Sequence, residues 1–182
     1  MTFGLHHLPN AICVVRIVLI LPIVMLLLAG EYRLALGLVL VAGASDALDG
    51  WLAKTFGWQT RLGGLLDPAA DKLLLVSLFL TLTWLGLTPV WLTAVVLGRD
   101  LVIVSGAVAF NFLIRKVQPE PSKVSKLNSF LQLLYGGSVL ALQAFGWPPD
   151  IVPLLIGAAV LVTSVVSGLD YVLTWGHRAR IA

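Results

Sequence analysis

The sequence has very little charge. Asp, Glu, Lys and Arg make up 12% of its 182 residues, whereas 59% are hydrophobic, and the mean hydropathy is +0.98. A soluble domain carries about 25% charged residues, so this chain has too few polar groups to cover a surface in water. The composition therefore excludes an ordinary soluble domain and predicts an integral membrane protein.

Cysteine is nearly absent. Cys13 is the only one, which excludes an intrachain disulfide and a metal cluster of cysteines. It stands in an apolar run, where we expect a packed and unreactive thiol. The sequence also has no internal repeat and no low-complexity tract, and its length suits a single domain over residues 1–182.

Positive charge is missing from the first ten residues, MTFGLHHLPN. A cleaved signal peptide begins with a positively charged stretch and has a shorter apolar run than the one of about 20 residues that follows here. We therefore expect a permanent first span. His6 and His7 are expected at the lipid headgroups rather than at a metal, because no third ligand stands near them in the sequence.

Apolar runs long enough to cross a bilayer recur along the chain. A hydrocarbon core of about 30 Å takes about 20 helical residues. Segments rich in Gly, Pro and polar residues, such as RKVQPEPSK and FGWPPD, separate the runs. The sequence thus predicts an all-α fold of six transmembrane helices, over residues 9–29, 34–54, 67–87, 89–113, 127–146 and 151–174.

Lysine and arginine gather in alternate loops of this prediction. The second loop, the fourth loop and the C-terminus contain Lys54, Arg61, Arg115, Lys116, Lys123, Lys126, Arg178 and Arg180, whereas the odd-numbered loops contain only Arg33. The positive-inside rule then places both termini in the cytoplasm, as in a bacterial inner membrane. This topology and anionic lipid account for the net charge of +3, so we expect membrane lipids and no nucleic acid as partners.

Four of the few acidic residues lie within one short stretch. Asp46 and Asp49 are three apart in the second predicted helix, and Asp67 and Asp71 are four apart in the third. Residues at these spacings share one face of a helix. Because the connecting loop is short, we expect the two helices to be antiparallel neighbours, with all four carboxylates converging at the cytoplasmic border of the membrane.

Carboxylates placed so close together repel one another unless cations neutralise them. Ligands that are all oxygen atoms favour hard ions, so the cluster predicts two divalent cations, Mg²⁺ or Mn²⁺, rather than zinc. Two such ions about 4 Å apart suit phosphoryl transfer, because they bind both the attacking and the leaving oxygen. Small residues nearby would let a bulky phosphorylated ligand approach the backbone. They are Gly50, Ala53, Gly63 and Gly64.

The stretch reads DxxDGxxAK, then eight residues, then GxxxDxxxD. It resembles the signature of the CDP-alcohol phosphotransferases, which are integral membrane enzymes of phospholipid synthesis. The eight signature positions are Asp46, Asp49, Gly50, Ala53, Lys54, Gly63, Asp67 and Asp71. Seven of them match in type and spacing. The departure is Lys54, where the family usually has Arg; lysine keeps the charge but loses the bidentate fork.

Other segments extend the resemblance. LPNAICVVR, with Asn10 and Arg16, is similar to the opening of the family's first helix, and GRDLVIVSGA is similar to its Arg-Asp element in the fourth. Cys13 stands where Thr or Ser is common. The resemblance implies a bundle of six transmembrane helices, usually dimeric, with a polar cavity open to the cytoplasm.

The same resemblance implies a mechanism. The donor would be a CDP-linked alcohol, most often CDP-diacylglycerol, and the four aspartates would surround two metal ions. Asp71 would also be the general base that takes the proton of the acceptor hydroxyl, which attacks the β-phosphorus and releases CMP. Gly50, Ala53, Lys54 and Gly63 would line the nucleotide pocket. The residues alone do not separate Asp71 from Asp67 as the base, because a carboxylate beside metal ions is a weak base.

Fixed charges point to the acceptor. Arg99 lies inside the fourth predicted helix, where it needs an anionic partner. That partner is either Asp170 or a phosphate of the acceptor, because Asp100 is expected to point elsewhere on the helix. Lys123 and Lys126 open the fifth helix and face either the cavity or the lipid surface. The candidate acceptor or phosphate ligands are Asn10, Arg16, Arg99, Lys123, Lys126 and Asn128.

The segment SKLNS, residues 125–129, is similar to the Ser-Lys-Val-Asn-Thr element of the eukaryotic-type cardiolipin synthases in this family. This similarity implies phosphatidylglycerol as acceptor and cardiolipin as product. Phosphatidylglycerophosphate synthesis from glycerol 3-phosphate is the alternative within the family.

Two other classes of protein fit the composition. An intramembrane cation carrier would use acids near the midplane of the membrane, whereas these lie at one border. A non-catalytic scaffold would pack small residues between helices but has no need of four acids.

Overall fold

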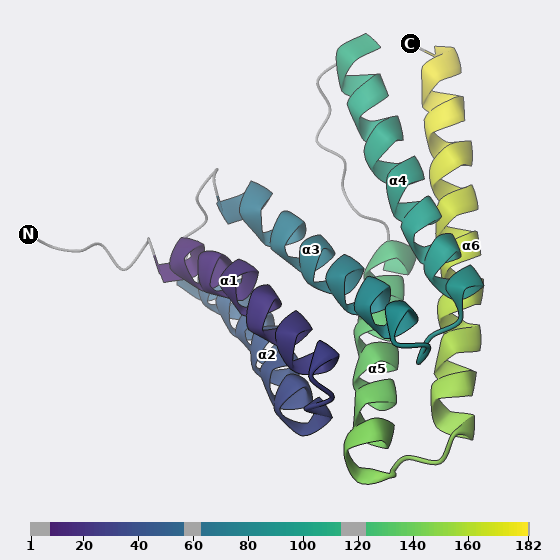
Figure 1. Cartoon of the computed structure of the whole chain (residues 1–182). Coiled ribbons are helices and arrows are strands. Elements are labelled where there is room, and N and C mark those ends of the chain that lie inside the picture. Colours follow the sequence, from purple (N-terminus) through teal and green to yellow (C-terminus); the bar gives the residue numbers. More distant parts are fainter. Residues whose placement is uncertain (1–7, 57–62, 114–122, 182) are drawn as a thin grey trace, which may run out of the picture. The chain divides into compact units, whose positions relative to one another are not determined.

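The computed structural model describes residues 8–56, 63–113 and 123–181, and the side chains within 13–45, 69–106 and 124–172. In these parts of the chain the protein contains α-helices and no strand (Figure 1). The helices are α1 (Leu8–Leu28), α2 (Tyr32–Phe56), α3 (Gly63–Trp84), α4 (Val90–Leu113), α5 (Lys123–Phe145) and α6 (Ile151–Ile181). The predicted all-α fold is thus confirmed, and each of the six predicted spans coincides with one helix.

Three helices extend by a full turn or more beyond the predicted spans. The helix α3 begins four residues before residue 67, α5 begins at Lys123 rather than at residue 127, and α6 continues to Ile181. These extra turns contain Gly, Lys or Arg, and a ruler based on apolar length leaves them out. The helical backbone of α5 and α6 therefore continues through the positively charged residues at these ends.

Two of the connections end in the same glycine motif. Gly30 and Gly86, with φ of 78° and 73°, each stand two residues beyond the end of their helix, α1 and α3. Gly30 donates its N–H to the carbonyl of Leu27, and Glu31 donates to that of Leu26, at 3.1 and 2.9 Å. This pair of hydrogen bonds requires one residue in the left-handed conformation, which glycine adopts without a steric cost. It ends α1 sharply and lets α2 begin at Tyr32.

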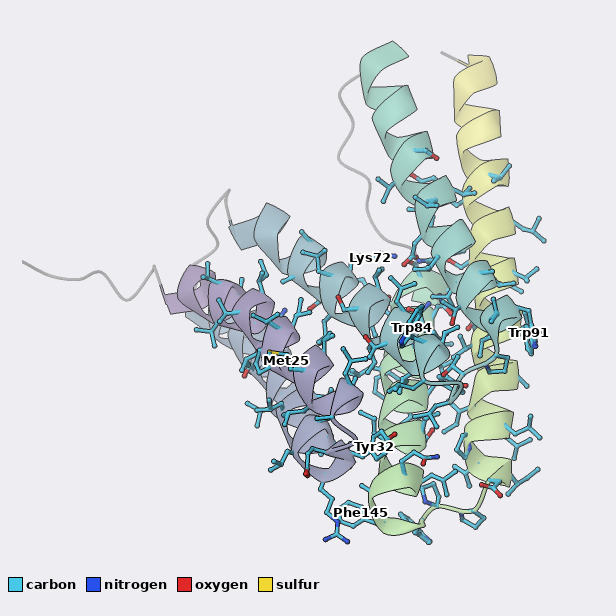
Figure 2. The ribbon with its side chains drawn as sticks, in the orientation of Figure 1. Met25, Tyr32, Lys72, Trp84, Trp91 and Phe145 are labelled. Atoms are coloured by element: carbon cyan, nitrogen blue, oxygen red, sulfur yellow. The ribbon has the colours of Figure 1, made fainter. Side chains whose placement is uncertain are left out.

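Several polar side chains are buried, and many large apolar ones are exposed. Arg16 and Gln132 are each 1% exposed, whereas Leu21 is 67% and Met25 is 62% exposed. Trp91 points away from the ribbon of its helix (Figure 2) and is 55% exposed. A soluble bundle has the opposite arrangement. The distribution is the one expected of helices surrounded by lipid.

One described segment, Ile151–Val172 in α6, has the length and composition of a membrane span. Its mean hydropathy is 2.2, and only 28% of it is buried inside the protein. A core helix of a soluble protein would be mostly buried, so burial separates this helix from that class.

The chain divides into two compact units. Unit 1 consists of Met1–Leu87 and Gly136–Pro149, and unit 2 of Thr88–Tyr135 and Asp150–Ala182. In unit 1 the helix α1 packs against both α2 and α3, and in unit 2 the helix α4 packs along α6 (Figure 1). The apolar core of unit 1 includes Ile23, Leu27, Val39, Leu78 and Phe79, and that of unit 2 includes Leu92, Val96 and Val160.

Close packing in unit 2 depends on a glycine. A Cβ atom at Gly157 would lie 3.0 Å from the ring of Tyr135 and 3.6 Å from the side chain of Leu92. The Tyr135 hydroxyl donates to Thr88 Oγ1 at 3.4 Å. The Tyr135 ring therefore packs against Gly157 at its edge and is fixed at its hydroxyl by Thr88.

The Gly157→Leu variant is expected to lower the free energy of unfolding by about 1–3 kcal/mol, because overpacking forces the Tyr135 ring to move. Thermal unfolding in detergent measures the change. Gly98→Leu is the matched control, since a Cβ at Gly98 meets nothing within 4 Å. Equal melting temperatures for the two variants would show that the contact at Gly157 does not hold the helices together.

Candidate active site

The four aspartates of the signature lie on two helices, as the sequence predicts. Asp46 and Asp49 belong to α2, and Asp67 and Asp71 belong to the first turns of α3. The helical backbone confirms that the members of each pair share a face. The side chains of Asp46, Asp49 and Asp67 lie outside the described residues, so their convergence stays a prediction.

Asp71 is the member of the cluster whose side chain the structure describes. Arg16 of α1 donates from Nη1 to Asp71 Oδ1 at 2.6 Å. The Arg16 side chain is fully buried, whereas 42% of the Asp71 side chain is exposed. The pair therefore joins a buried cation to a partly exposed carboxylate.

The burial of Arg16 follows from the face on which it lies. Cys13, Arg16, Ile23 and Leu27 share the inner face of α1, and each is at most 1% exposed. The helix buries this face against α2 and α3. Arg16 thus reaches α3 from inside unit 1, and the expectation that Cys13 is a packed thiol is confirmed.

Arg16 was predicted as a ligand for acceptor or phosphate. In the structure its guanidinium group instead forms a hydrogen bond to Asp71, the predicted base. A buried arginine needs such an anionic partner in an apolar surrounding. Spacing could not reveal the pair, because 55 residues separate its members.

A second cluster surrounds Arg99 in unit 2. Arg99 Nη1 donates to Asp100 Oδ1 at 2.7 Å, and Nη2 donates to Ser125 Oγ at 2.6 Å and to Ser167 Oγ at 2.5 Å. Both charged side chains are buried, at 4% and 9% exposure. The cluster joins one residue of α5 and one of α6 to the Arg-Asp pair of α4.

The expectation that Asp100 points away from Arg99 is wrong. Neighbouring residues leave a helix about 100° apart, but the long arginine side chain spans that angle and folds back on the carboxylate. Asp170, the alternative partner, is exposed. Pairing with Asp100 neutralises the charge of the buried cation without any ligand.

Asn128 is fully buried beside this cluster. Its Oδ1 accepts hydrogen bonds from Thr163 and Ser164 of α6, at 2.8 and 3.0 Å. Lys126, two residues earlier, is exposed. Of the predicted acceptor ligands in unit 2 whose side chains are described, Arg99 and Asn128 are buried and Lys126 is exposed.

The remaining predicted site residues have described backbones only. Asn10 lies in α1, Lys123 begins α5, and Gly63 begins α3. Gly50, Ala53 and Lys54 follow the acids in α2. Their surroundings lie outside the described residues, so the nucleotide pocket stays a prediction.

Sequence reasoning included Asn128 among the candidate ligands but missed the hydroxyl of Ser125, which binds Arg99, and the buried amide of Gln132. Ser125, Asn128 and Gln132 follow one another at spacings of three and four residues. Gln132 stands between two leucines, and polar residues that share one face of an apolar helix indicate a polar interior. That spacing was the available clue.

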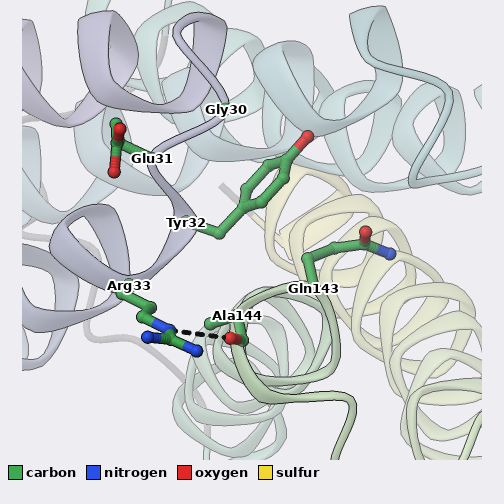
Figure 3. A pocket seen from close by; sticks show the side chains of 6 residues that line it. All are labelled: Gly30, Glu31, Tyr32, Arg33, Gln143 and Ala144. Atoms are coloured by element: carbon green, nitrogen blue, oxygen red, sulfur yellow. Dashed lines mark hydrogen bonds between the residues drawn. The ribbon is translucent and has the colours of Figure 1, made fainter.

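A pocket of about 270 Å³ lies at the other end of α1 (Figure 3). It is lined by Gly30, Glu31, Tyr32, Arg33, Gln143 and Ala144. Arg33 Nε donates to the Ala144 carbonyl at 3.0 Å, and its guanidinium lies 5.4 Å from the centre of the Phe145 ring.

This pocket is remote from the aspartates. Gly30 is 14 residues beyond Arg16, and the helical part of that distance, from Arg16 to Leu28, is about 18 Å long. A cation at the C-terminal end of a helix stabilises the last carbonyls. Arg33, the one positive charge in an odd-numbered loop, thus has a structural role in holding the end of α5.

Comparison with known proteins identifies the chain. The family model of CDP-alcohol phosphatidyltransferase matches residues 6–174, which include Arg16 and all four aspartates. The chain belongs to the CDP-alcohol phosphatidyltransferase family. The resemblance drawn from the signature is thereby confirmed.

Two similar members of the family are named cardiolipin synthases. The cardiolipin synthase (CMP-forming) of Rattus norvegicus is 30% identical over 179 residues, 90% of this chain and 59% of that protein. The cardiolipin synthase (CMP-forming) of Streptomyces coelicolor is 38% identical over 116 residues, 62% of this chain and 52% of that protein.

A third relative is covered almost completely. The CDP-diacylglycerol–glycerol-3-phosphate 3-phosphatidyltransferase of Aquifex aeolicus is 32% identical over 172 residues, 92% of this chain and 94% of that protein. By contrast, the chain spans about 59% of the length of the rat cardiolipin synthase.

Proposed function

We propose that this protein transfers a phosphatidyl group from CDP-diacylglycerol to the hydroxyl of an anionic glycerol-type acceptor and releases CMP. The observation that carries the proposal is the ion pair of Arg16 and Asp71. It places a buried cation against the last aspartate of the family signature, within the segment that the family matches. We assign Asp71 as the catalytic base.

The acidic cluster would hold two divalent cations, Mg²⁺ or Mn²⁺, through Asp46, Asp49, Asp67 and Asp71. Carboxylate oxygens are the ligands these ions prefer, and the open side of Asp71 leaves its carboxylate accessible. Among the residues with described side chains no group of three such ligands occurs, because three of the four aspartates lie outside them. Bound at the cluster, the ions would neutralise charge on the donor's pyrophosphate.

The chain's own residues then perform the proton transfer. Asp71 accepts the proton of the acceptor hydroxyl, whose oxygen forms a new ester bond to the β-phosphorus. The bond between that phosphorus and the bridging oxygen breaks, and CMP leaves with the electron pair. Arg16 holds the Asp71 carboxylate in one orientation, which favours an aligned hydroxyl. Gly50, Ala53, Lys54 and Gly63 line the cytidine nucleotide pocket.

Phosphatidylglycerol is the acceptor that unit 2 supports best. Arg99 is paired with Asp100, so the buried cluster has little net charge. A neutral cluster suits the glycerol end of a phosphodiester lipid better than a phosphomonoester with nearly two negative charges. The product would then be cardiolipin. Asn10, Lys123 and Lys126 stay candidate ligands of the acceptor's phosphate.

Synthesis of phosphatidylglycerophosphate from glycerol 3-phosphate is the second candidate. The observation in its favour is the nearly complete coverage of the Aquifex aeolicus enzyme, which is named for that acceptor. A cation carrier is the alternative from another class, but a base held by a buried arginine has no evident use in it.

The proposed setting is an integral membrane domain with six spans. The exposed apolar side chains and the alternation of Lys and Arg between loops support both termini in the cytoplasm, with the polar cavity open to that side. We place it in a bacterial inner membrane, as a single domain over residues 1–182 that forms a homodimer.

Product analysis tests the proposed function. Purified protein in detergent receives CDP-dioleoylglycerol and Mn²⁺ with phosphatidylglycerol, glycerol 3-phosphate or inositol phosphate, each offered separately. We expect CMP release and cardiolipin, identified by mass spectrometry, with phosphatidylglycerol alone. Phosphatidylglycerophosphate as the main product would establish the second candidate, and no CMP release with any acceptor would refute the activity.

A further inference from the structure

The described part of α5 in unit 2 has a buried polar stripe and an exposed apolar one. Asn128 is 0% and Gln132 is 1% exposed, whereas Leu127 is 51% and Phe130 is 61% exposed. Four residues separate Asn128 from Gln132, so they lie on the same face of the helix. This face turns toward Ser164 of α6 through the hydrogen bond to Asn128.

Nitrogen atoms on this stripe lack hydrogen-bond partners. Asn128 Nδ2, Gln132 Nε2 and Arg99 Nε are all buried and make no hydrogen bond. In an apolar surrounding each such donor is costly, so native proteins rarely keep one without a use. Arg99 Nε and Gln132 Nε2 are N–H donors, whichever way the Asn128 amide is turned, and together they call for a ligand that supplies oxygen atoms.

The side-chain orientation of Asn128 does not remove the deficit. The hydroxyls of Thr163 and Ser164 both face the same atom of its amide, at 2.8 and 3.0 Å. If the amide were turned over, the nitrogen would gain these hydroxyls and the oxygen would lose them. One polar atom of Asn128 is therefore without a partner in either orientation.

The size and charge of the stripe narrow the ligand. Arg99 reaches Ser125 at one end, and Gln132 stands seven residues further on, which is about 10 Å of helix. This length matches a glycerol headgroup with its phosphate. Asp100 already neutralises Arg99, so the donors suit hydroxyl and phosphodiester oxygens rather than a second strong charge.

We propose that the stripe from Arg99 to Gln132 binds the glycerol headgroup of the acceptor, and that Gln132 is a specificity-determining residue that donates from Nε2 to a headgroup oxygen. The inference rests on the proposed function for the identity of the acceptor. Gln132 belongs to none of the motifs that identify the family in the sequence. Its assignment comes from its burial and its unused donor.

The Gln132→Leu variant tests this assignment. We expect KM for phosphatidylglycerol to rise about tenfold, the effect of losing one good hydrogen bond, while KM for CDP-diacylglycerol stays unchanged. The melting temperature without ligand should stay equal or rise, because the variant removes a buried donor that has no partner. A merely structural glutamine would behave in the opposite way, with a lower melting temperature and an unchanged KM.

Two further variants make the test specific. Gln132→Glu keeps the shape of the side chain but replaces the donor with an acceptor. It should therefore raise KM for phosphatidylglycerol at least as much as Gln132→Leu does. Gln143→Leu is the matched control on the same helix; Gln143 is exposed, and neither KM nor stability should change. A KM for phosphatidylglycerol within twofold of the wild type in both Gln132 variants would overturn the proposal.

A binding measurement separates this proposal from the proposed activity. The melting temperature is compared in detergent micelles that contain phosphatidylglycerol or phosphatidylcholine, without any CDP-diacylglycerol. Phosphatidylglycerol should raise it for the wild type and for Gln143→Leu but not for Gln132→Leu. An equal rise in all three proteins would overturn the role of Gln132. Absence of CMP release in the separate assay would count against the activity alone.

Discussion

The Asp71→Asn variant is expected to lose turnover by about 1,000-fold, because asparagine cannot accept the proton of the acceptor hydroxyl. It should also unfold more easily, by about 1–3 kcal/mol, because the buried Arg16 loses its ion pair with this carboxylate. The 42% exposure of the Asp71 side chain keeps this cost below that of a fully buried pair. CMP release and thermal unfolding in detergent measure the two effects.

A double variant separates catalysis from stability. Arg16→Gln combined with Asp71→Asn replaces the ion pair with two neutral amides, so most of the lost stability should return. Turnover should not return, because the base is still missing. Wild-type turnover in Asp71→Asn would exclude Asp71 as the base and leave Asp67 as the candidate. Stability that does not depend on position 16 would show that the pair is not coupled.

The Asp100→Leu variant is expected to destabilise the protein by about 3–5 kcal/mol. It leaves the Arg99 charge, whose side chain is 4% exposed, without the carboxylate that neutralises it. The hydroxyls of Ser125 and Ser167 continue to accept from Arg99 but supply no charge. Thermal unfolding in detergent gives the size of the effect.

The matched control is Asp170→Leu. Asp170 is an exposed acid on the neighbouring α6, and its loss should change stability by less than about 0.5 kcal/mol. Arg99→Met combined with Asp100→Leu removes both charges and should recover most of the stability. If Asp170→Leu were the more harmful change, Arg99 would depend on Asp170 and not on its neighbour in the sequence.

The helices were predictable because each depends on a local property of the chain. An apolar run of about 20 residues forms a helix in a membrane whatever its neighbours are, since the backbone must satisfy its own hydrogen bonds there. The spacing of Asp46 from Asp49, and of Asp67 from Asp71, then follows from helical geometry alone. The polar ends of α3, α5 and α6 were missed because apolar length does not register them.

The partners of the buried charges were not predictable in the same way. Arg16 and Asp71 are 55 residues apart in the sequence, and only the packing of α1 against α3 brings them together. For Arg99 the sequence left Asp170 and a ligand phosphate open. The side chain instead folds back onto Asp100, because in a buried position the nearest carboxylate lowers the energy most.

The sequence alone determined the six helices, the spacing of the aspartates along them and the family. Each of these depends on apolar run length or on the spacing of nearby residues, which are local properties of the chain. Only the tertiary structure decided that Arg16 pairs with Asp71 and Arg99 with Asp100. It also left the side-chain nitrogen atoms of Asn128 and Gln132 buried without hydrogen-bond partners. Those choices depend on distances between segments far apart in the sequence, and such distances exist only after the helices have packed.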